Sequence, residues 1–135
     1  MTDPSKQNIL IPISPGELLD KITILEIKSE RIDSAEKKSH VNNELALLNT
    51  VWYDSVAEDA ELKLLREELK SINESLWVIE DAIRQEERNK SLGDRFIELA
   101  RNVYVTNDKR ADVKKRVNLH LNSEIVEEKS YKDYT

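Results

Sequence analysis

The stretch that decides the fold is residues 62–83, LKLLREELKSINESLWVIEDAI. Its apolar side chains recur at alternating intervals of three and four residues, at Leu62, Leu65, Leu69, Ile72, Leu76, Ile79 and Ile83. This spacing is typical of a coiled-coil-like seam along one side of an α-helix. Because the repeat continues over three heptads, it indicates a long helix and argues against disorder, although the charged composition alone would suit a disordered chain.

The clearest helix start precedes this seam. Ser14 has the position of a helix cap, Pro15 that of the first helical residue, and Glu17 that of the residue that reaches back in a capping box. Ile13 and Leu18 occupy the two positions of a hydrophobic staple. The helix that follows has two apolar faces, one with Leu18, Ile22, Leu25 and Ile32 and the other with Ile24 and Ile27. We therefore expect it to be covered on two sides, by a third helix or by another subunit.

Further signals mark the second and third helices. Residues 33–36, DSAE, offer the cap of a second helix. Asp54 and Ser55, followed by Glu58, start the third helix, which contains the seam. Gly93 ends it, which gives a helix of about 35 residues.

Similar signals divide the last third of the chain into two predicted helices. Asp94 caps a fourth helix, which has a broad apolar face over residues 96–104. Residues 106–108, TND, interrupt the pattern, and a fifth helix runs from there to about Asn122.

The two ends of the chain differ from its middle. Residues 8–13 and 124–128 are short β-compatible segments that would either pair with each other or stay extended. The sequence therefore predicts an all-α protein, an antiparallel bundle of about five helices with one long coiled-coil-like helix. Residues 8–135 would form a single domain behind a flexible N-terminus of residues 1–7.

Composition excludes several classes of protein. The chain has 135 residues, a net charge of −6, two glycines, three prolines and no cysteine, which argues against all-β folds, disulfides and thiolate metal sites. No apolar run is long enough for a membrane span, and the first residues lack the pattern of a signal peptide. We expect a cytoplasmic protein without a membrane partner. Residues 109–116 include five basic side chains but no aromatic one, so a nucleic-acid partner is not expected.

Motifs of the common enzyme classes are absent from the sequence. There is no phosphate-binding glycine loop, HExxH or GxSxG motif, and His40 and His120 lack neighbours at ligand spacing. Helical pyrophosphohydrolases bind Mg²⁺ through an EExxE motif, which neither Glu67-Glu68 nor Glu86-Glu87 completes. We therefore predict neither a metal site nor a cofactor, and i,i+4 pairs on solvated helix faces explain the many carboxylates.

One polar cluster lies beside the seam of the long helix. Asn73, Trp77, Glu80 and Arg84 follow one flank of the apolar stripe, with Glu80 nearly on it. A polar group at the edge of a seam costs stability unless it has a partner. An interhelical salt bridge that fixes the register would explain the cluster, and a functional site is the alternative.

A second cluster lies at the start of the predicted fifth helix. Lys109 and Arg110 fall in its first turn, where the helix dipole disfavours cations, and Arg110 shares a wheel position with apolar residues. Together with the backbone amides after Asn107 and with Arg101, Arg110 would hold a phosphate or carboxylate. A salt bridge from Arg110 to a neighbouring helix is the structural alternative.

The sequence also resembles an uncharacterised bacterial domain family of unknown function. Four blocks carry the resemblance: GELLDKITILEIK at residues 16–28, LWVIED at 76–81, LARNVYVTND at 99–108 and EEKSY at 127–131. The resemblance covers the chain from about residue 8 and implies one compact bacterial domain. It implies no activity.

The function that these patterns favour is binding, while the reaction, if any, is unknown. We expect a non-enzymatic helical protein that binds a partner or a small anionic ligand and forms a homodimer, because a helix of about 35 residues spans roughly 50 Å and exposes its seam in a small monomer. The alternative is a small helical enzyme that acts on a phosphorylated or carboxylated metabolite. Residues 108–111, DKRA, weakly resemble a D-x-R-E stretch of chorismate mutases, with Ala111 at the position of the glutamate.

Overall fold

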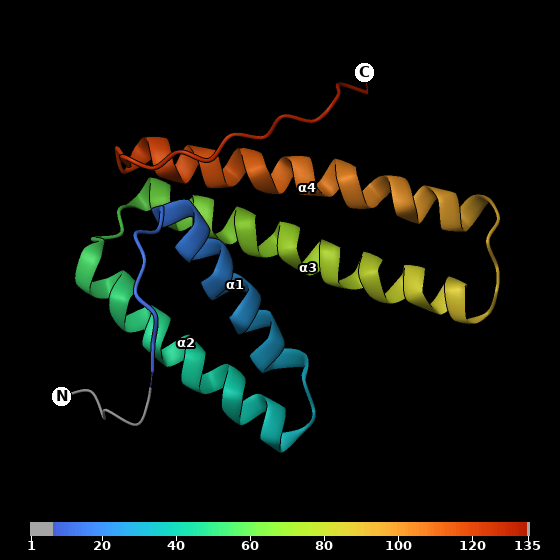
Figure 1. The fold of residues 1–135 in the computed structure, drawn as a ribbon, viewed down its shortest axis with the longest axis horizontal. Coiled ribbons are helices and arrows are strands. Elements are labelled where there is room, and N and C mark those ends of the chain that lie inside the picture. The colour runs from blue at the N-terminus through green and yellow to red at the C-terminus, as the bar shows by residue number, and fades with distance from the viewer. Residues whose placement is uncertain (1–6, 135) are drawn as a thin grey trace.

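The computed structural model describes residues 7–134 and folds them into four helices. These are α1 (Pro15–Arg31), α2 (Ala35–Ser55), α3 (Ala60–Arg88) and α4 (Asp94–His120) (Figure 1). The all-α fold class is confirmed, but the chain has four helices in the described residues instead of five. The predicted flexible N-terminus, residues 1–7, lies outside the described residues except for Gln7.

The predicted starts of the first two helices are confirmed. The Ser14 side chain caps α1 by accepting a hydrogen bond from the backbone N–H of Glu17 at 3.2 Å, and Pro15 is the first helical residue. The Ser34 hydroxyl caps α2 by accepting from the N–H of Lys37 at 3.4 Å. The Glu17 carboxylate does not reach back to the cap, because it pairs with Lys114 of α4 at 2.5 Å.

The predicted limits of the third helix are wrong by several residues. Residues 54–55 still belong to α2, and Asp59 caps α3 by accepting from the N–H of Leu62 at 2.8 Å. Trp52, one turn before the end of α2, is buried in the protein core. At the other end α3 stops at Arg88, so it has 29 residues, and Gly93 instead of Asp94 is the N-cap of α4.

The predicted interruption at residues 106–108 is also wrong, because α4 continues through it. Along this helix, buried and half-buried side chains recur at intervals of three or four residues, at Phe96, Leu99, Val103, Thr106, Arg110, Val113 and Val117. Thr106 and Arg110 are polar members of this repeat, and they make the sequence pattern look broken. The polarity of Arg110 has a structural cause, described below, and neither residue ends the helix.

The fold is a long antiparallel hairpin of α3 and α4, with α1 and α2 packed at one end (Figure 1). Helix α1 contacts α2, α3 and α4, so its two apolar faces are covered within the chain. The core lies where these helices meet and contains Leu18, Leu19, Ile22, Trp52, Leu62, Leu65, Leu69, Val113 and Val117. The other end of the hairpin, on both sides of the loop 89–93, extends beyond α1 and α2 (Figure 1).

The two end segments stay extended and do not pair as strands, since residues 7–134 contain no strand. Residues 9–11 are largely exposed.

The chain reverses its direction after α4. Asn122 adopts a left-handed conformation (φ 52°), and the Ser123 N–H donates to the carbonyl of Asn118 at 2.9 Å, which is a common way of closing a helix. The chain then turns back along α4 (Figure 1). We call residues 123–134 the C-terminal strap. Within the described residues, no helix is sufficiently long and apolar to cross a membrane.

Candidate functional site

A buried carboxylate, that of Asp20, joins three helices. It lies in the second turn of α1 with no exposed surface. Arg110 of α4 donates to it twice, from Nε to Oδ1 at 2.9 Å and from Nη2 to Oδ2. Asn73 of α3 donates from Nδ2 to the same Oδ1 at 2.9 Å and to the Thr23 hydroxyl at 3.1 Å. Thr23 in turn donates to the backbone carbonyl of Asp20 at 2.9 Å.

This network explains why polar residues interrupt two apolar stripes. A carboxylate removed from water is costly unless it is paired and hydrogen-bonded. Arg110 supplies the opposite charge in a bidentate geometry, and Asn73 supplies a further donor. The hydrogen bond to Asp20 raises the pKa of Arg110 above its ordinary value, although the partial burial of the guanidinium opposes this. Asp20 is therefore fully engaged in holding the helices together.

The start of α1 lies directly against α4. The backbone N–H of Gly16 donates to Asn118 Oδ1 at 2.7 Å. A Cβ atom at residue 16 would lie 2.8 Å from that oxygen and closer still to the carbonyl oxygen of Lys114. Glycine is therefore required here by the close approach of two backbones.

Lys114 lies one turn beyond Arg110 on α4, and its side chain is only 15% exposed. Its Nζ is 2.5 Å from the Glu17 carboxylate and 3.6 Å from that of Glu127 in the strap. Burial opposes the ionisation of Glu17, but the hydrogen bond and the charge of Lys114 outweigh it and hold the pKa of Glu17 below its ordinary value. Lys114, a residue of α4, is thus connected both to α1 and to the strap.

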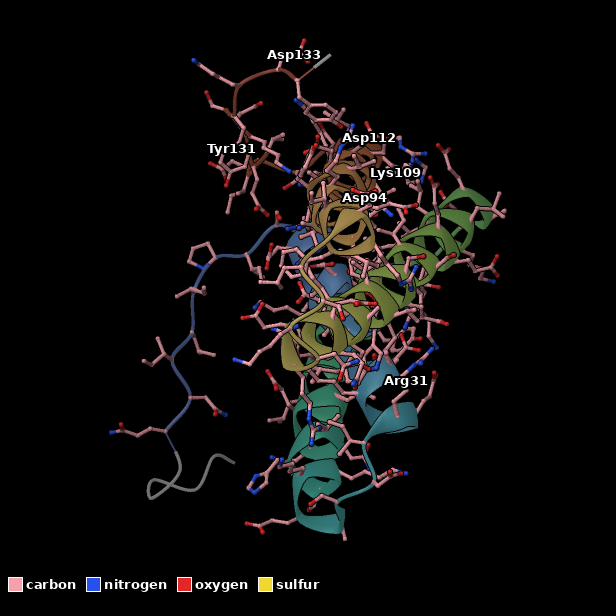
Figure 2. All side chains as sticks on the ribbon, turned by 90° about the vertical axis from the view of Figure 1, so that its right-hand side faces the viewer. Arg31, Asp94, Lys109, Asp112, Tyr131 and Asp133 are labelled. Carbon is pink, nitrogen blue, oxygen red and sulfur yellow. The ribbon has the colours of Figure 1, made fainter. Side chains whose placement is uncertain are left out.

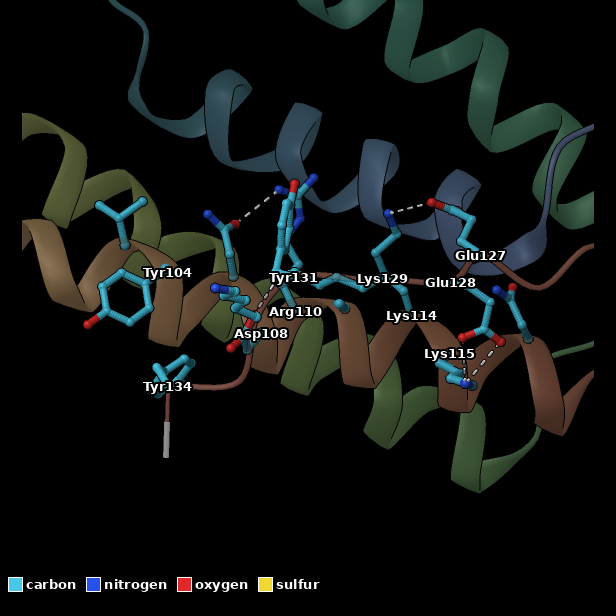
Figure 3. A pocket seen from close by; sticks show the side chains of 15 residues that line it. Tyr104, Asp108, Arg110, Lys114, Lys115, Glu127, Glu128, Lys129, Tyr131 and Tyr134 are labelled. Atoms are coloured by element: carbon cyan, nitrogen blue, oxygen red, sulfur yellow. Dashed lines mark hydrogen bonds and ion pairs between the residues drawn. The ribbon is translucent and has the colours of Figure 1, made fainter.

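Between α4 and the strap lies a cavity of about 690 Å³, which we call the strap pocket (Figure 3). Its volume is within the range of small-molecule sites. One face of α4 forms its floor, because residues three or four positions apart lie on the same side of a helix. That face contributes Val103, Asn107, Arg110, Ala111, Lys114 and Asn118. Tyr104 and Tyr134 close one end, with ring centroids 5.0 Å apart (Figure 3).

The strap is held over this pocket by ion pairs along its length. Glu127 pairs with Lys114 and also accepts from the Ser14 hydroxyl at 3.3 Å. Further along, Glu128 pairs with Lys115 at 3.3 Å and Lys129 pairs with Asp108 at 2.6 Å. The hydrogen bond from Lys129 lowers the pKa of Asp108 below its ordinary value. The strap therefore runs antiparallel to α4.

The residues predicted to bind an anion do not all lie together. Arg110 and Asn107 line the strap pocket, and Arg110 Nη1 is 3.5 Å from Asn107 Oδ1. Lys109 lies on another side of α4, near Asp112 and away from Tyr131 (Figure 2). Arg101 is exposed, and on a continuous helix it lies about 180° from Arg110.

The predicted contribution of a helix terminus is wrong. The amides after Asn107 belong to the interior of α4, where backbone hydrogen bonds occupy them. Arg110 pairs with a carboxylate of a neighbouring helix, as in the structural alternative. Binding of an anion by Arg110 and Asn107 stays a prediction that depends on the pocket and not on the helix dipole.

The residues of the predicted polar cluster on the long helix also do not all act together. Asn73 is buried and belongs to the Asp20 network. Trp77 is half-buried, and Arg84 pairs with Glu80 one turn away on the same helix. The predicted interhelical salt bridge is wrong for Glu80 and Arg84, because they pair with each other within α3. The interhelical contact of this cluster is instead the hydrogen bond of Asn73 to Asp20 of α1.

Sequence reasoning did not single out several residues that shape this site. On a helical wheel Asp20 falls between Ile24 and Ile27, on the second apolar face of α1, and this position was the available signal. Lys114 was part of the basic stretch at residues 109–116 and was considered only as part of a nucleic-acid surface, and Asn118 gave no signal. Within residues 7–134, no three histidine or carboxylate side chains are placed to hold a metal ion. His120 has a partner, since its Nε2 lies 2.7 Å from Asp59.

Comparison with known proteins gives a family without an assigned activity. The model of a family of unknown function, DUF6165, matches residues 9–134. No curated protein and no solved structure matches the chain. The predicted resemblance to an uncharacterised family is thereby confirmed.

Proposed function

The chain belongs to this family of unknown function, and we propose that it binds a small anionic ligand, phosphorylated or carboxylated, in the strap pocket. The observation that carries the proposal is the pair of partly buried cations on its floor. Arg110 and Lys114 lie one helical turn apart, and their side chains are 30% and 15% exposed. The protein as a whole has a charge of −6, so basic side chains gathered in a cavity are a local feature with a distinct use.

Both cations have donors to spare. A guanidinium has five N–H donors and an ammonium has three. Arg110 uses Nε and Nη2 for Asp20, and its Nη1 is turned toward Asn107 at the limit of hydrogen-bonding distance. A phosphate or carboxylate between Arg110 and Lys114 would receive charge-assisted hydrogen bonds from both. The Asp20 network would hold the guanidinium in place before the ligand arrives.

The carboxylates around the pocket favour binding over catalysis. Glu17, Asp20, Asp108, Glu127 and Glu128 each form an ion pair with a basic side chain. A general base needs a proton-accepting oxygen directed at the substrate. Each of these carboxylates is instead directed at a basic side chain within the protein. An enzyme acting on an anionic metabolite remains the alternative proposal, and turnover of a bound compound would favour it.

Titration calorimetry with inorganic phosphate and with succinate tests the proposal and separates the two ligand chemistries. We expect one of them to bind the wild type, and Lys114→Gln to weaken that binding about tenfold or more, since a hydrogen bond to a charged group is lost. Arg101→Gln is the matched control, because it removes one exposed cation from the opposite side of α4. Equal affinities of Lys114→Gln and the wild type would contradict the proposed site.

We also propose that the protein forms a homodimer through the projecting end of the α3–α4 hairpin, in a coiled-coil-like contact. A pair of helices buries only the sides that face each other, and within residues 7–134 no third helix packs against this end (Figure 1). Val78, Leu92 and Ile97 there are each more than half exposed, and a second hairpin would cover them. Sedimentation should give a mass near twice 15.7 kDa.

The dimer proposal has its own variants. Ile97→Asp should return the mass toward 15.7 kDa, because a charge would be buried in the contact. Leu64→Asp changes a leucine that is 65% exposed at the other end of α3 and should leave the dimer intact. A wild-type mass near 15.7 kDa at micromolar concentration would refute the dimer without affecting the ligand site. A cytoplasmic setting is likewise a proposal, which the absence of cysteine supports. A bacterial source is proposed from the resemblance of the four sequence blocks.

A further inference from the structure

The acidic residues of the strap occupy the positions that a ligand's anionic group would need. The Glu127 carboxylate is 3.6 Å from Lys114 Nζ and accepts from the hydroxyl of Ser14, itself almost fully buried. The next carboxylate, of Glu128, lies on Lys115 (Figure 3). Two consecutive glutamates thus neutralise two consecutive lysines at one end of the pocket. An incoming phosphate or carboxylate would have to compete with Glu127 for the same ammonium group.

The strap is bound in a way that allows it to leave. Its contacts with α4 are ion pairs of partly exposed side chains and the edge-to-face contact of Tyr134 with Tyr104, and exposed ion pairs contribute little to stability. Its aromatic side chains add little burial, since Tyr131 is 83% exposed and Tyr134 is 55% exposed. The helices below it have their own apolar core, to which none of residues 123–134 contributes. Release of the strap would therefore leave the helical fold in place.

Lys114 would also remain in position without the strap. Its closer partner is Glu17 of α1, at 2.5 Å, and this pair does not involve the strap. Removal of Glu127 therefore leaves an ammonium group that is oriented by α1 and has donors free toward the pocket. The Ser14 hydroxyl, which also caps α1, would face the same space.

From this arrangement, and resting on the proposed function, we infer that the strap is an autoinhibitory segment whose Glu127 carboxylate is an internal competitor of the anionic ligand. Ligand binding displaces Glu127 from Lys114, and the strap then lifts from α4. Because a tethered carboxylate is present at high effective concentration, the protein responds only to ligands that outcompete it. Binding of the ligand is in this way coupled to exposure of residues 123–134.

Affinity measurements on three full-length chains test this inference. We expect Glu127→Gln to bind the anion that titrates the pocket, inorganic phosphate or succinate, several-fold more tightly than the wild type. Glu124→Gln is the matched control, since it removes one exposed carboxylate from the same segment away from Lys114, and its affinity should equal that of the wild type. Equal affinities of all three chains would overturn the inference and leave the proposed function standing. If none of the three binds either anion, the proposed function itself fails, and the competition fails with it.

Displacement of the strap has a separate readout. Trypsin cleaves after lysine, and the strap contains Lys129 and Lys132. Cleavage at these residues in the wild type should be several-fold faster at a saturating concentration of the bound anion than in chloride of the same ionic strength, which controls for screening of the ion pairs. An unchanged cleavage rate would show that the ligand binds with the strap in place, and would overturn the coupling.

Discussion

Asn73 and Arg110, on different helices, donate to the same oxygen of Asp20, each at a distance of 2.9 Å. Through this one atom α1 is fixed in register against both arms of the α3–α4 hairpin. Each residue is polar at a place where an apolar side chain would pack. Because the two residues share this oxygen, we expect the effects of replacing Asn73 and Arg110 on stability to be non-additive.

Loss of the Arg110 side chain should be strongly destabilising. Arg110→Ala leaves the Asp20 carboxylate buried without its counter-charge, which we expect to cost about 3–5 kcal/mol. Urea unfolding followed by circular dichroism measures the change. The double variant Asp20→Asn with Arg110→Ala should be more stable than Arg110→Ala alone, because the uncompensated charge is gone. If the second substitution restores nothing, the pair does not carry the stability assigned to it.

A methyl group at residue 16 should separate α1 from α4. Gly16→Ala brings a Cβ within 2.8 Å of Asn118 Oδ1 and against the backbone of Lys114, and overpacking of this kind costs about 1–3 kcal/mol. Gly93→Ala is the control, since nothing lies within 4 Å of its Cβ position. We expect the control to cost less than about 1 kcal/mol, from the helix cap alone. Similar losses in both variants would contradict a specific close approach at Gly16.

Removal of the first helix cap should have a moderate effect. Ser14→Ala takes away the oxygen that accepts from Glu17 N–H, which we expect to cost about 1 kcal/mol. Ser34→Ala removes the cap of α2, which is exposed and has a longer hydrogen bond of 3.4 Å, so its effect should be smaller. Thermal melting of the two variants compares them directly. Unchanged melting of Ser14→Ala would show that the close contact with α4 holds the start of α1 without its cap.

The Glu17–Lys114 pair should make stability depend on pH in the acidic range. The pKa of Glu17 is lowered from an ordinary value of 4.5 in the folded protein, so the folded state holds the ionised form more strongly than the unfolded chain does. The resulting stabilisation is present above about pH 4.5 and is lost as the pH falls through the lowered pKa. Wild type and Glu17→Gln should therefore differ in free energy of unfolding at pH 7 and converge toward pH 3. A difference that stays constant between these pH values would mean that ionisation of Glu17 is not its source.

Local patterns were sufficient for much of the fold. The heptad spacing of residues 62–83 predicted the long α3, Ser14 was identified as a cap, and residues 33–36 were identified as the start of α2. These features depend on residues within one or two turns, which a sequence displays directly. The predicted interruption at residues 106–108 is wrong because Thr106 and Arg110 break the apolar pattern while the helix continues through them.

The candidate site was predictable only in part, for a related reason. Asn73 and Arg110 were each identified as polar residues at unusual positions, but they were assigned to separate clusters. Their common partner, Asp20, is 53 residues from one and 90 from the other in the chain. The sequence pattern around each residue does not indicate which distant residue it contacts in the fold. The same holds for Lys114 and Glu127, whose pairing depends on the reversal of the chain at Asn122.

The long separation between Asp20 and Arg110 also has a consequence during synthesis. The two residues are 90 positions apart, and a ribosome that adds about 5–20 residues per second would need roughly 5–18 s to produce the second after the first. Throughout that interval the carboxylate and the apolar faces of α1 have no partner on α4. The hairpin of α1 and α2 therefore emerges as an unfinished unit, and a nascent chain truncated before Arg110 should be a better substrate for chaperones and proteases than the completed protein.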